Sequence, residues 1–387
     1  MNSKRVSIWG ATGSIGRQTL DVIGRYRDRF DVVALTAHQN VCLLFEQARQ
    51  FHPRYVVMTG QAEYKEWVPQ FEKLDIEFLV GKKAFLKAAG RGEEDLVVNA
   101  LVGTVGLEAT LKAIEAGKSI ALANKEVLVM AGEIVMNEVS RRGVNLLPVD
   151  SEHCAIFQCL RGEEIQNVRR ILLTASGGPF LHKDKSEMAR VTVQEALDHP
   201  NWSMGKKVTI DSSTLMNKGL EMIEAKWLFG IDASKIEVVI HPQSIIHSMV
   251  EFRDGSMKAQ LGVPDMRIPI LYALTYPERW AGDFGCVDFT KVNQLTFSPP
   301  DTEKYPALRF AYEVMKTGGT APAVLNAADE MAVDLFLSGQ ITFNQITEII
   351  DAVLQRHEVI VHPDLDEILN ADQWARTMIL KSLAPNL

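Results

Sequence analysis

The sequence predicts an α/β protein with three parts: an N-terminal doubly wound domain, a central α+β domain and a C-terminal helical domain. Three observations predict this order. Up to about residue 149, short apolar runs alternate with helix-like segments, which is typical of a parallel sheet. Residues 150–281 contain strand-like runs separated by polar loops with glycine and proline. From residue 305 onward the apolar residues recur with helical periodicity.

The N-terminal domain, residues 1–149, begins with the pattern strand, glycine loop, helix. Residues 5–9, with Val6, Ile8 and Trp9 apolar, predict a buried strand, a loop follows at 10–16, and residues 18–26 have the pattern of an amphipathic helix. Further strands are expected at 31–37, 55–58, 96–100, 119–123 and 145–149. This alternation predicts a Rossmann-like, nucleotide-binding domain.

The rest of the chain changes its pattern twice. In the central domain, residues 150–281, strands are expected at 169–173, 208–210 and 236–240. Residues 282–304 are expected to be a linker. The C-terminal domain, residues 305–387, has helical periodicity at 306–318, 322–338 and 343–356.

Composition excludes several classes of protein. With 387 residues, of which 47% are hydrophobic, the chain exceeds what one core usually serves. A net charge of −8 gives no general footprint for nucleic acid. The four cysteines have neither metal-ligand spacing nor disulfide density, and no apolar run approaches a membrane span. These features favour a cytoplasmic protein without membrane or nucleic-acid partners.

The glycine loop favours a bound dinucleotide. Gly10, Gly13 and Gly16 permit a tight turn, close approach of a pyrophosphate and close packing of the helix on the strand. Glycine turns after strands also occur for purely structural reasons. The position of this loop in the first βαβ unit favours nucleotide binding. The phosphates would be lined by Thr12, Gly13, Ser14 and Ile15.

The end of the second strand bears on the choice of nucleotide. A ribose-binding acid is expected there for NAD, and a cation for the 2′-phosphate of NADP. The sequence reads Ala37-His38-Gln39-Asn40, so NAD is disfavoured. NADP would have to be recognised through His38, Gln39, Asn40 or a more distant cation.

Two carboxylates at the end of the 145–149 strand could chelate a metal ion. Asp150 and Glu152 are two residues apart, and an extended strand would point both to the same side. Oxygen ligands suit Mg²⁺ or Mn²⁺, and Glu221 is the best candidate for a third ligand. The alternative is a solvated acidic pair at a strand end, with His153 packing or hydrogen-bonding nearby.

A second group of polar residues is suited to an ester phosphate. It offers hydroxyl, amide and ammonium groups without bulky neighbours, from Ser176, Ser212, Asn217 and Lys218. Turns and helix caps use the same residue types, which is the structural alternative. A helix is expected from 217 to 228, with Lys218 and Glu221 on one face.

Residues 199–207 have the features of a lid over a reacting substrate. The segment contains Pro200, Gly205, Trp202 and Met204, and its aromatic ring could exclude water while His199 contacts a phosphate. A loop with Trp202 packed in the core is the alternative.

An ordered set of segments carries a resemblance that runs nearly end to end. The segments are GATGSIG at 10–16, NALVGTVGL at 99–107, LANKE at 122–126, LLPVDSEHCAIFQ at 146–158, TASGGPF at 174–180, HPNWSMGKK at 199–207, DSSTLMNKGLE at 211–221, HPQSIIHSMVE at 241–251 and QLGVPDMR at 260–267. In this order they resemble the 1-deoxy-D-xylulose 5-phosphate reductoisomerase family, which depends on NADPH and a divalent metal ion. The sequence departs from this family at 38–39, where members often carry a basic residue.

The resemblance implies roles for individual residues. It implies a metal ion, Mg²⁺ or Mn²⁺ with Co²⁺ as an alternative, held by Asp150, Glu152 and Glu221. The substrate phosphate would be bound by Ser176, His199, Ser212, Asn217 and Lys218. The reacting end of the substrate would meet Lys125, Ser151 and Glu152. NADPH would contact Thr12, Gly13, Ser14, Ile15, Asn40, Asn124, Glu126 and Gly205, with Trp202 and Met204 as the lid.

The resemblance also implies the reaction and the assembly. The substrate's carbon skeleton would be cleaved and rejoined with electrostatic help from Lys125, and hydride from NADPH would then give 2-C-methyl-D-erythritol 4-phosphate. The family suggests a homodimer. Two alternatives stay open: an aspartate-semialdehyde-dehydrogenase-like enzyme with Cys154 as nucleophile, and a nucleotide-binding regulator without catalysis.

Overall fold

The computed structural model describes residues 3–60, 64–198, 202 and 204–383. The chain forms two compact units that alternate along the sequence. The first comprises Met1–Val127, Val135–Cys154 and Asp265–Gly285, and the second comprises Leu128–Ile134, Ala155–Pro264 and Cys286–Leu387. The three-domain division at 149, 281 and 304 stays a prediction.

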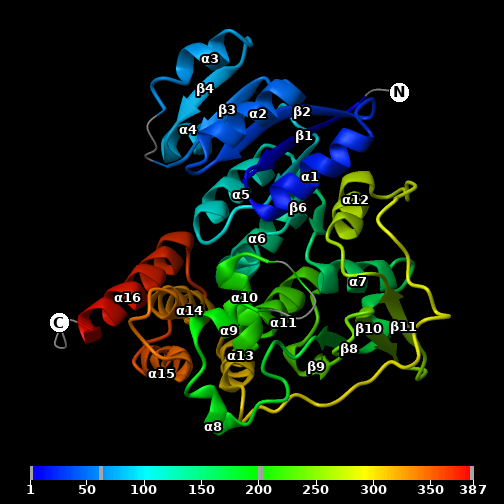
Figure 1. Ribbon diagram of the computed structural model, residues 1–387, viewed down its shortest axis with the longest axis vertical. Helices are drawn as coiled ribbons and strands as arrows, with labels where there is room; N and C mark the ends of the chain where they lie inside the picture. Colours follow the sequence, from blue (N-terminus) through cyan, green and yellow to red (C-terminus); the bar gives the residue numbers. More distant parts are fainter. Residues whose placement is uncertain (1–2, 61–63, 199–201, 203, 384–387) are drawn as a thin grey trace. The chain divides into compact units, whose positions relative to one another are not determined.

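The first unit contains a seven-stranded parallel sheet (Figure 1). Its strands are β1 (Lys4–Trp9), β2 (Phe30–Ala37), β3 (Tyr55–Met58), β4 (Glu77–Val80), β5 (Leu96–Asn99), β6 (Ser119–Leu122) and β7 (Leu146–Pro148). The order β4-β3-β2-β1-β5-β6-β7 reverses direction between β1 and β5. In such sheets a ligand binds at the carboxyl ends of the strands beside this reversal. The doubly wound fold is therefore confirmed.

The helices of this unit connect the parallel strands. They are α1 (Ser14–Arg25), α2 (Val41–Phe51), α3 (Val68–Glu72), α4 (Lys82–Ala89), α5 (Val105–Glu115), α6 (Glu126–Arg142) and α12 (Arg267–Thr275). Parts of α6 fall in both units, and its backbone departs from helical geometry at Ala131. Helix α12 packs against α1 although it lies far away in the sequence. The Lys4 ammonium donates to the Leu274 carbonyl over 2.8 Å, which ties this late segment to the first strand.

A buried ion pair lies at the opposite, amino edge of this sheet. The Lys118 ammonium contacts the Glu94 carboxylate at 2.5 Å, and the two side chains are 1% and 0% exposed. Glu94 also accepts hydrogen bonds from Ser7 and Tyr55, over 2.7 and 2.8 Å. Burial acts to raise the pKa of Glu94, but Lys118 and the two hydroxyls outweigh it and lower that pKa below 4.5. The ionised pair is thus part of the folded core.

Lys118→Met should lower the free energy of unfolding by about 3–5 kcal/mol at pH 7, because it leaves a buried carboxylate without its cation. Because folding lowers the pKa of Glu94 below its usual value of 4.5, its ionisation stabilises the folded state above that pH. This stabilisation is lost as the pH falls through the folded-state pKa. The difference between the two proteins should therefore shrink in acid. Urea unfolding at pH 7 and pH 4 measures it. The exposed Lys112→Met on α5 is the control, and equal losses for both variants would contradict the buried role.

The second unit contains a mixed four-stranded sheet. Its strands are β8 (Val168–Ala175), β9 (Ile236–Ile240), β10 (Ile246–Phe252) and β11 (Met257–Leu261), in the order β11-β10-β8-β9. Strand β8 is parallel to β9 and antiparallel to β10, and β10 is antiparallel to β11. The α+β character predicted for this region is confirmed.

Helices make up most of the regular secondary structure of the second unit. They are α8 (Lys185–Met188), α9 (Val193–Ala196), α10 (Lys206–Thr214), α11 (Met216–Phe229), α13 (Pro306–Thr317), α14 (Ala321–Leu337), α15 (Phe343–Leu354) and α16 (Leu365–Leu383), with short 3-10 helices at Ile165–Asn167 and Ala233–Lys235. Helix α7 (Ser151–Cys159) begins in the first unit and continues in the second. Helix α14 packs against α15 and α16 (Figure 1). Within the described part of the chain, no helix has the length and apolarity needed to cross a membrane.

The predicted strand at 208–210 is wrong. Val208, Thr209 and Ile210 have strand-forming side chains, but they lie in α10. The Ser213 hydroxyl within the same helix donates to the Ala196 carbonyl over 3.0 Å, so packing overrides the local preference. Strands β4, β10 and β11 and helix α16 were not predicted as such.

Candidate active site

The predicted nucleotide residues of the first unit gather at the carboxyl edge of its sheet. Each follows the end of a strand, and all seven strands run parallel. Thr12 to Ile15 follow β1, Asn40 follows β2, and Asn124 and Glu126 follow β6. The loop after β1 lies at the reversal of strand order, where a dinucleotide binds in sheets of this kind.

The glycine loop fits a pyrophosphate. A Cβ on Gly16 would lie 2.2 Å from the Gly10 carbonyl oxygen, so only glycine lets α1 begin this close to the loop. Gly10 has φ of +80°, and its Cβ would lie 2.5 Å from the Ala100 carbonyl oxygen of the loop after β5. The N-cap residue of α1 is Gly13, which has no side chain to cap the helix. Its first backbone N–H groups are therefore suited to an anionic phosphate.

Two of the predicted nucleotide residues also organise the backbone. Asn40 accepts a hydrogen bond from the Leu43 N–H over 3.0 Å and so caps α2. The buried Asn124 amide donates to the carbonyls of Leu101 and Gly103, over 2.8 and 3.1 Å. Asn124 thereby fixes the loop after β5 at the reversal point. His38 and Gln39 are exposed just beyond β2, the position that distinguishes NAD from NADP in sheets of this kind.

Asp150 and Glu152 do not form the extended pair that the sequence suggested. Strand β7 ends at Pro148 and α7 begins at Ser151, so the alternation of a strand does not apply to them. Asp150 instead precedes the helix, and its carboxylate accepts from the Glu152 N–H over 3.2 Å. Both acids lie at the amino end of α7, where the positive end of the helix dipole attracts negative charge.

Two basic side chains approach Asp150. The Lys125 ammonium donates to one carboxylate oxygen over 3.2 Å, and His153 Nδ1 lies 3.2 Å from the other. His153 is buried, which agrees with its predicted packing or hydrogen-bonding role. The Ser151 hydroxyl donates to Glu152 over 2.6 Å. The predicted reacting-site residues of the first unit therefore lie close together: Lys125, Asp150, Ser151 and Glu152.

Helix α11 carries three of the predicted site residues of the second unit. Lys218 and Glu221 are buried and form an ion pair, and the Asn217 amide also donates to Glu221. The predicted helix and the shared face of Lys218 and Glu221 are confirmed. A proposed metal ligand and two proposed phosphate ligands thus lie within five residues of one helix.

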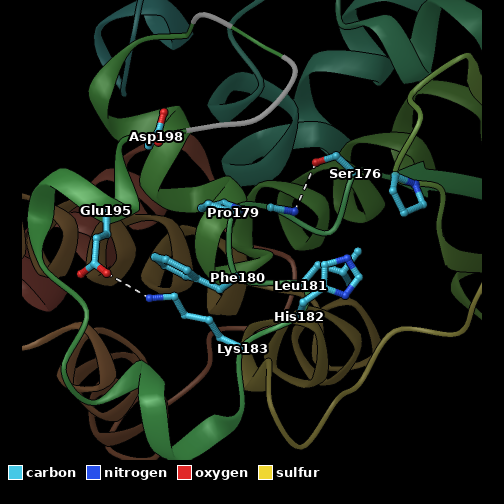
Figure 2. A pocket seen from close by; sticks show the side chains of 10 residues that line it. Ser176, Pro179, Phe180, Leu181, His182, Lys183, Glu195 and Asp198 are labelled. Carbon is cyan, nitrogen blue, oxygen red and sulfur yellow. Dashed lines mark hydrogen bonds and ion pairs between the residues drawn. The ribbon is translucent and has the colours of Figure 1, made fainter.

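The structure brings the Ser176 loop against Ser212. Gly178 has φ of +67°, and a Cβ there would lie 2.6 Å from the Ser212 carbonyl oxygen. The Gly178 N–H also donates to the Ser176 hydroxyl over 3.2 Å, which is the turn chemistry named as the structural alternative. A cavity of about 470 Å³ adjoins this loop, and Figure 2 shows Ser176 at its edge and the ion pair of Lys183 with Glu195 in its wall.

Part of the predicted lid is described. His199 lies outside the described residues. Trp202 and Met204 are half-buried, and the Trp202 ring lies 6.2 Å from that of His247 between centroids. Burial lowers the pKa of His247, so this imidazole is a largely neutral neighbour for the indole. Gly205 is exposed and directly precedes α10.

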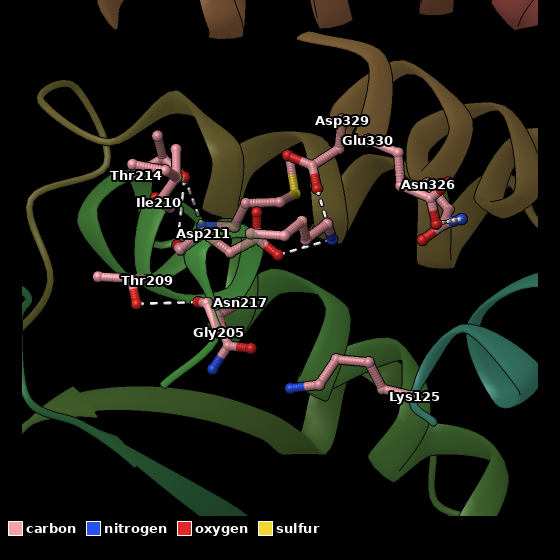
Figure 3. A network of polar contacts seen from close by, with 12 residues as sticks. Lys125, Gly205, Thr209, Ile210, Asp211, Thr214, Asn217, Asn326, Asp329 and Glu330 are labelled. Atoms are coloured by element: carbon pink, nitrogen blue, oxygen red, sulfur yellow. Dashed lines mark hydrogen bonds and ion pairs between the residues drawn. The ribbon is translucent and has the colours of Figure 1, made fainter. Parts of the chain in front are cut away.

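One polar cluster near these residues was not predicted from the sequence. Lys207 and Asp211 of α10 meet Asp329 of α14 (Figure 3). The sequence does contain a signal for this cluster: Asp329 lies within the apolar sequence of α14, which predicts a buried charge and therefore a charged partner.

Family models match three consecutive regions of the chain. Residues 6–132 match 1-deoxy-D-xylulose 5-phosphate reductoisomerase, and residues 146–229 match its C-terminal domain. Residues 261–378 match a further model, described as the DXP reductoisomerase C-terminal domain.

Full-length relatives and solved structures agree with these matches. The 1-deoxy-D-xylulose 5-phosphate reductoisomerase of Thermoanaerobacter sp. (strain X514) is 54% identical over 98% of this chain and 99% of the relative. The Zymomonas mobilis enzyme, solved with NADPH, is 45% identical, with a TM-score of 0.91 over 97% of this chain and 98% of that one. A DOX-P reductoisomerase solved with NADPH, fosmidomycin and magnesium is 39% identical, with a TM-score of 0.94 over 99% of both chains.

Proposed function

Since this chain belongs to the 1-deoxy-D-xylulose 5-phosphate reductoisomerase family, we propose how its own residues perform the family's reaction. The activity is the NADPH- and divalent-metal-dependent isomerisation and reduction of 1-deoxy-D-xylulose 5-phosphate to 2-C-methyl-D-erythritol 4-phosphate, in non-mevalonate isoprenoid biosynthesis. The observation that carries this assignment is the 54% identity to a named member over 98% of the chain.

The divalent ion is held by Asp150 and Glu152 of the first unit and Glu221 of the second. Three carboxylates offer the oxygen donors that Mg²⁺ and Mn²⁺ prefer, and Co²⁺ is an alternative. Glu221 is 1% exposed, and a buried acid of this kind needs a cation, which Lys218 supplies in this structure and the metal ion would supply when bound. When bound, the ion supplies Lewis-acid polarisation of the substrate's carbonyl and hydroxyl oxygens.

Lys125 and Ser151 act at the reacting end of the substrate. The Lys125 ammonium lies 3.2 Å from Asp150, so it faces the acids proposed to hold the ion. A fixed positive charge there stabilises negative charge that develops on the substrate oxygens as the skeleton rearranges. Ser151 donates to Glu152 and keeps that carboxylate oriented.

Five residues hold the phosphate at the other end of the substrate: Ser176, His199, Ser212, Asn217 and Lys218. Support comes from Gly178, which packs the Ser176 loop directly on the Ser212 backbone. It also comes from α11, which carries an amide and a buried ammonium one residue apart. Binding energy from this unreactive end orders the groups around the reacting carbons, so it raises turnover as well as affinity.

The nucleotide lies along the carboxyl edge of the seven-stranded sheet. Its phosphates meet the backbone of Thr12 to Ile15, and the other contacts come from Asn40, Asn124, Glu126 and Gly205. The rearrangement of the carbon skeleton gives an aldehyde, and NADPH, when bound, supplies the hydride that reduces it. Trp202 and Met204 exclude water from the reacting carbons as the lid.

The two alternatives to this function carry less weight. Cys154 lies in α7 and is 1% exposed, and a buried thiol is a poor nucleophile. A regulator without catalysis has no need for the acids, lysine and serine that share one corner of the first unit, and turnover with the sugar phosphate separates it from an enzyme.

The assembly and location complete the proposal. Strand β11 is an edge strand with Met257 and Leu261 exposed, which suits pairing with a second copy in a homodimer. Light scattering would then give about twice the chain mass of 43.1 kDa, and a monomer mass would exclude the dimer. A cytoplasmic location is supported by four free cysteines, Cys42, Cys154, Cys159 and Cys286.

Direct Mn²⁺ binding tests the proposed ligands. Asp150→Asn should weaken the binding of Mn²⁺ at least about 10-fold, because the amide loses the charge while asparagine still caps the start of α7. Titration followed by electron paramagnetic resonance measures free Mn²⁺. Asp301→Asn is the control, since Asp301 also accepts backbone N–H bonds at an exposed turn. Unchanged affinity in Asp150→Asn would remove this residue from the site.

A further inference from the structure

A buried triad of charges joins α10 to α14. The Lys207 ammonium lies 2.6 Å from an Asp211 carboxylate oxygen and 2.9 Å from an Asp329 carboxylate oxygen. The side chains of Lys207, Asp211 and Asp329 are 16%, 1% and 0% exposed. Figure 3 shows Asp211 on α10 and Asp329 on α14 with the ion pairs converging between them. Two helices that are more than a hundred residues apart are therefore linked by one cation.

Because of its position in α10, Lys207 depends on a second acidic partner, Asp329, in addition to Asp211. A lysine in the first turn of a helix is repelled by the positive end of the helix dipole, and burial adds a desolvation cost. Asp211, one turn later in the same helix, compensates part of this cost. Asp329 completes the compensation only while α10 is docked against α14. The triad therefore favours one placement of α10.

Helix α14 is a fixed support for this contact. Most of its residues are buried, and Glu330, the acid next to Asp329, also forms an ion pair. Arg376 of α16 contacts Glu330 at 2.5 Å and Asp372 at 2.9 Å. Movement of α14 relative to both α10 and α16 would therefore disturb two ion-pair groups at once.

The far end of α10 carries a proposed substrate ligand. Ser212 follows Asp211 directly, and the Ser212 carbonyl packs against Gly178 beside the Ser176 loop. We propose that Asp329 is a positioning residue for the reaction: through Lys207 and Asp211 it holds α10 in the placement that presents Ser212 to the substrate phosphate. This inference rests on the proposed function, in which Ser212 is a phosphate ligand. It gives a C-terminal helix a role in substrate binding without any contact to the substrate.

A double-mutant cycle tests this role. Asp329→Asn keeps the shape of the side chain and removes its charge, so the KM for 1-deoxy-D-xylulose 5-phosphate should rise about 10-fold. In a Ser212→Ala background the same change should raise KM less than about 2-fold, because the positioned hydroxyl is already absent. Asp366→Asn, an exposed aspartate on α16 of the same unit, is the control and should leave KM unchanged.

Several outcomes distinguish a positioning role from a general loss of stability. An equal rise in KM in both backgrounds, or no rise in either, overturns the inference while the proposed function stands. A wild-type protein that does not turn over the sugar phosphate overturns the proposed function itself. Circular dichroism checks the fold of each variant. If Asp329→Asn does not fold, Lys207→Gln tests the same triad from α10, with the same two outcomes in the two backgrounds.

Discussion

Glu221→Gln should lower metal-dependent turnover at least about 100-fold, because loss of an outer-shell partner already costs 10–100-fold and a direct ligand should cost at least as much. Glutamine keeps the size of the side chain and an acceptor for the Asn217 amide, but it removes the charge that attracts the ion. Initial rates of NADPH oxidation over a range of Mn²⁺ concentrations measure the effect. A higher Mn²⁺ concentration should recover part of the rate.

Two controls make this result specific. NADPH binding, followed by its fluorescence, should be unchanged, because the proposed nucleotide contacts come chiefly from the first unit. Glu313→Gln on α13 removes an exposed acid from the same unit and should keep the wild-type rate. A Glu221→Gln protein with the wild-type rate and the wild-type dependence on Mn²⁺ would contradict the proposed third ligand.

Lys218→Gln should lower kcat/KM roughly 30- to 5,000-fold. This corresponds to a loss of about 2–5 kcal/mol of transition-state stabilisation, the usual cost of removing one partner of a buried charged hydrogen bond. Lys218 is 4% exposed, so water does not replace the lost ammonium. Because phosphate binding energy orders the reacting end, kcat should fall together with a rise in KM. Steady-state kinetics with 1-deoxy-D-xylulose 5-phosphate measure both, and inorganic phosphate should become a weaker competitor.

The same helix provides a matched control for this lysine. Lys226, two turns later in α11, donates to the Met315 carbonyl over 3.0 Å. Lys226→Gln should change kcat/KM less than about 3-fold, because it leaves the proposed phosphate site intact. Unchanged kcat at saturating substrate in Lys218→Gln would show that this lysine contributes no orienting energy.

The first unit was predictable because its pattern is local. Each β-α repeat places an apolar strand before a helix, and the glycine spacing after β1 has a direct steric reason at Gly16. Strand β4 escaped prediction because its apolar run is only three residues long, Phe78 to Val80, and its four residues are exposed or half-buried. The prediction that Asp150 and Glu152 form an extended pair was wrong because α7 begins at Ser151, directly after Asp150. The two-residue periodicity of a strand does not reveal this helix start.

The site residues were predictable as a set only through ordered motifs. Spacing alone left Asp150 and Glu152 open to a surface role, and Ser176 does take part in a turn. The triad of Lys207, Asp211 and Asp329 could not be derived from local patterns, because its partners come from helices far apart in the sequence. Packing of α10 likewise overrode the strand preference of Val208 to Ile210.

The most direct test of the central claim is NADPH consumption with 1-deoxy-D-xylulose 5-phosphate, followed by absorbance after the protein has been stripped with a chelator. The account predicts no consumption without added metal, and with Mg²⁺ or Mn²⁺ one NADPH consumed for each 2-C-methyl-D-erythritol 4-phosphate formed, identified by mass spectrometry. NADPH consumption that is independent of metal, or no product with any divalent ion, would contradict it.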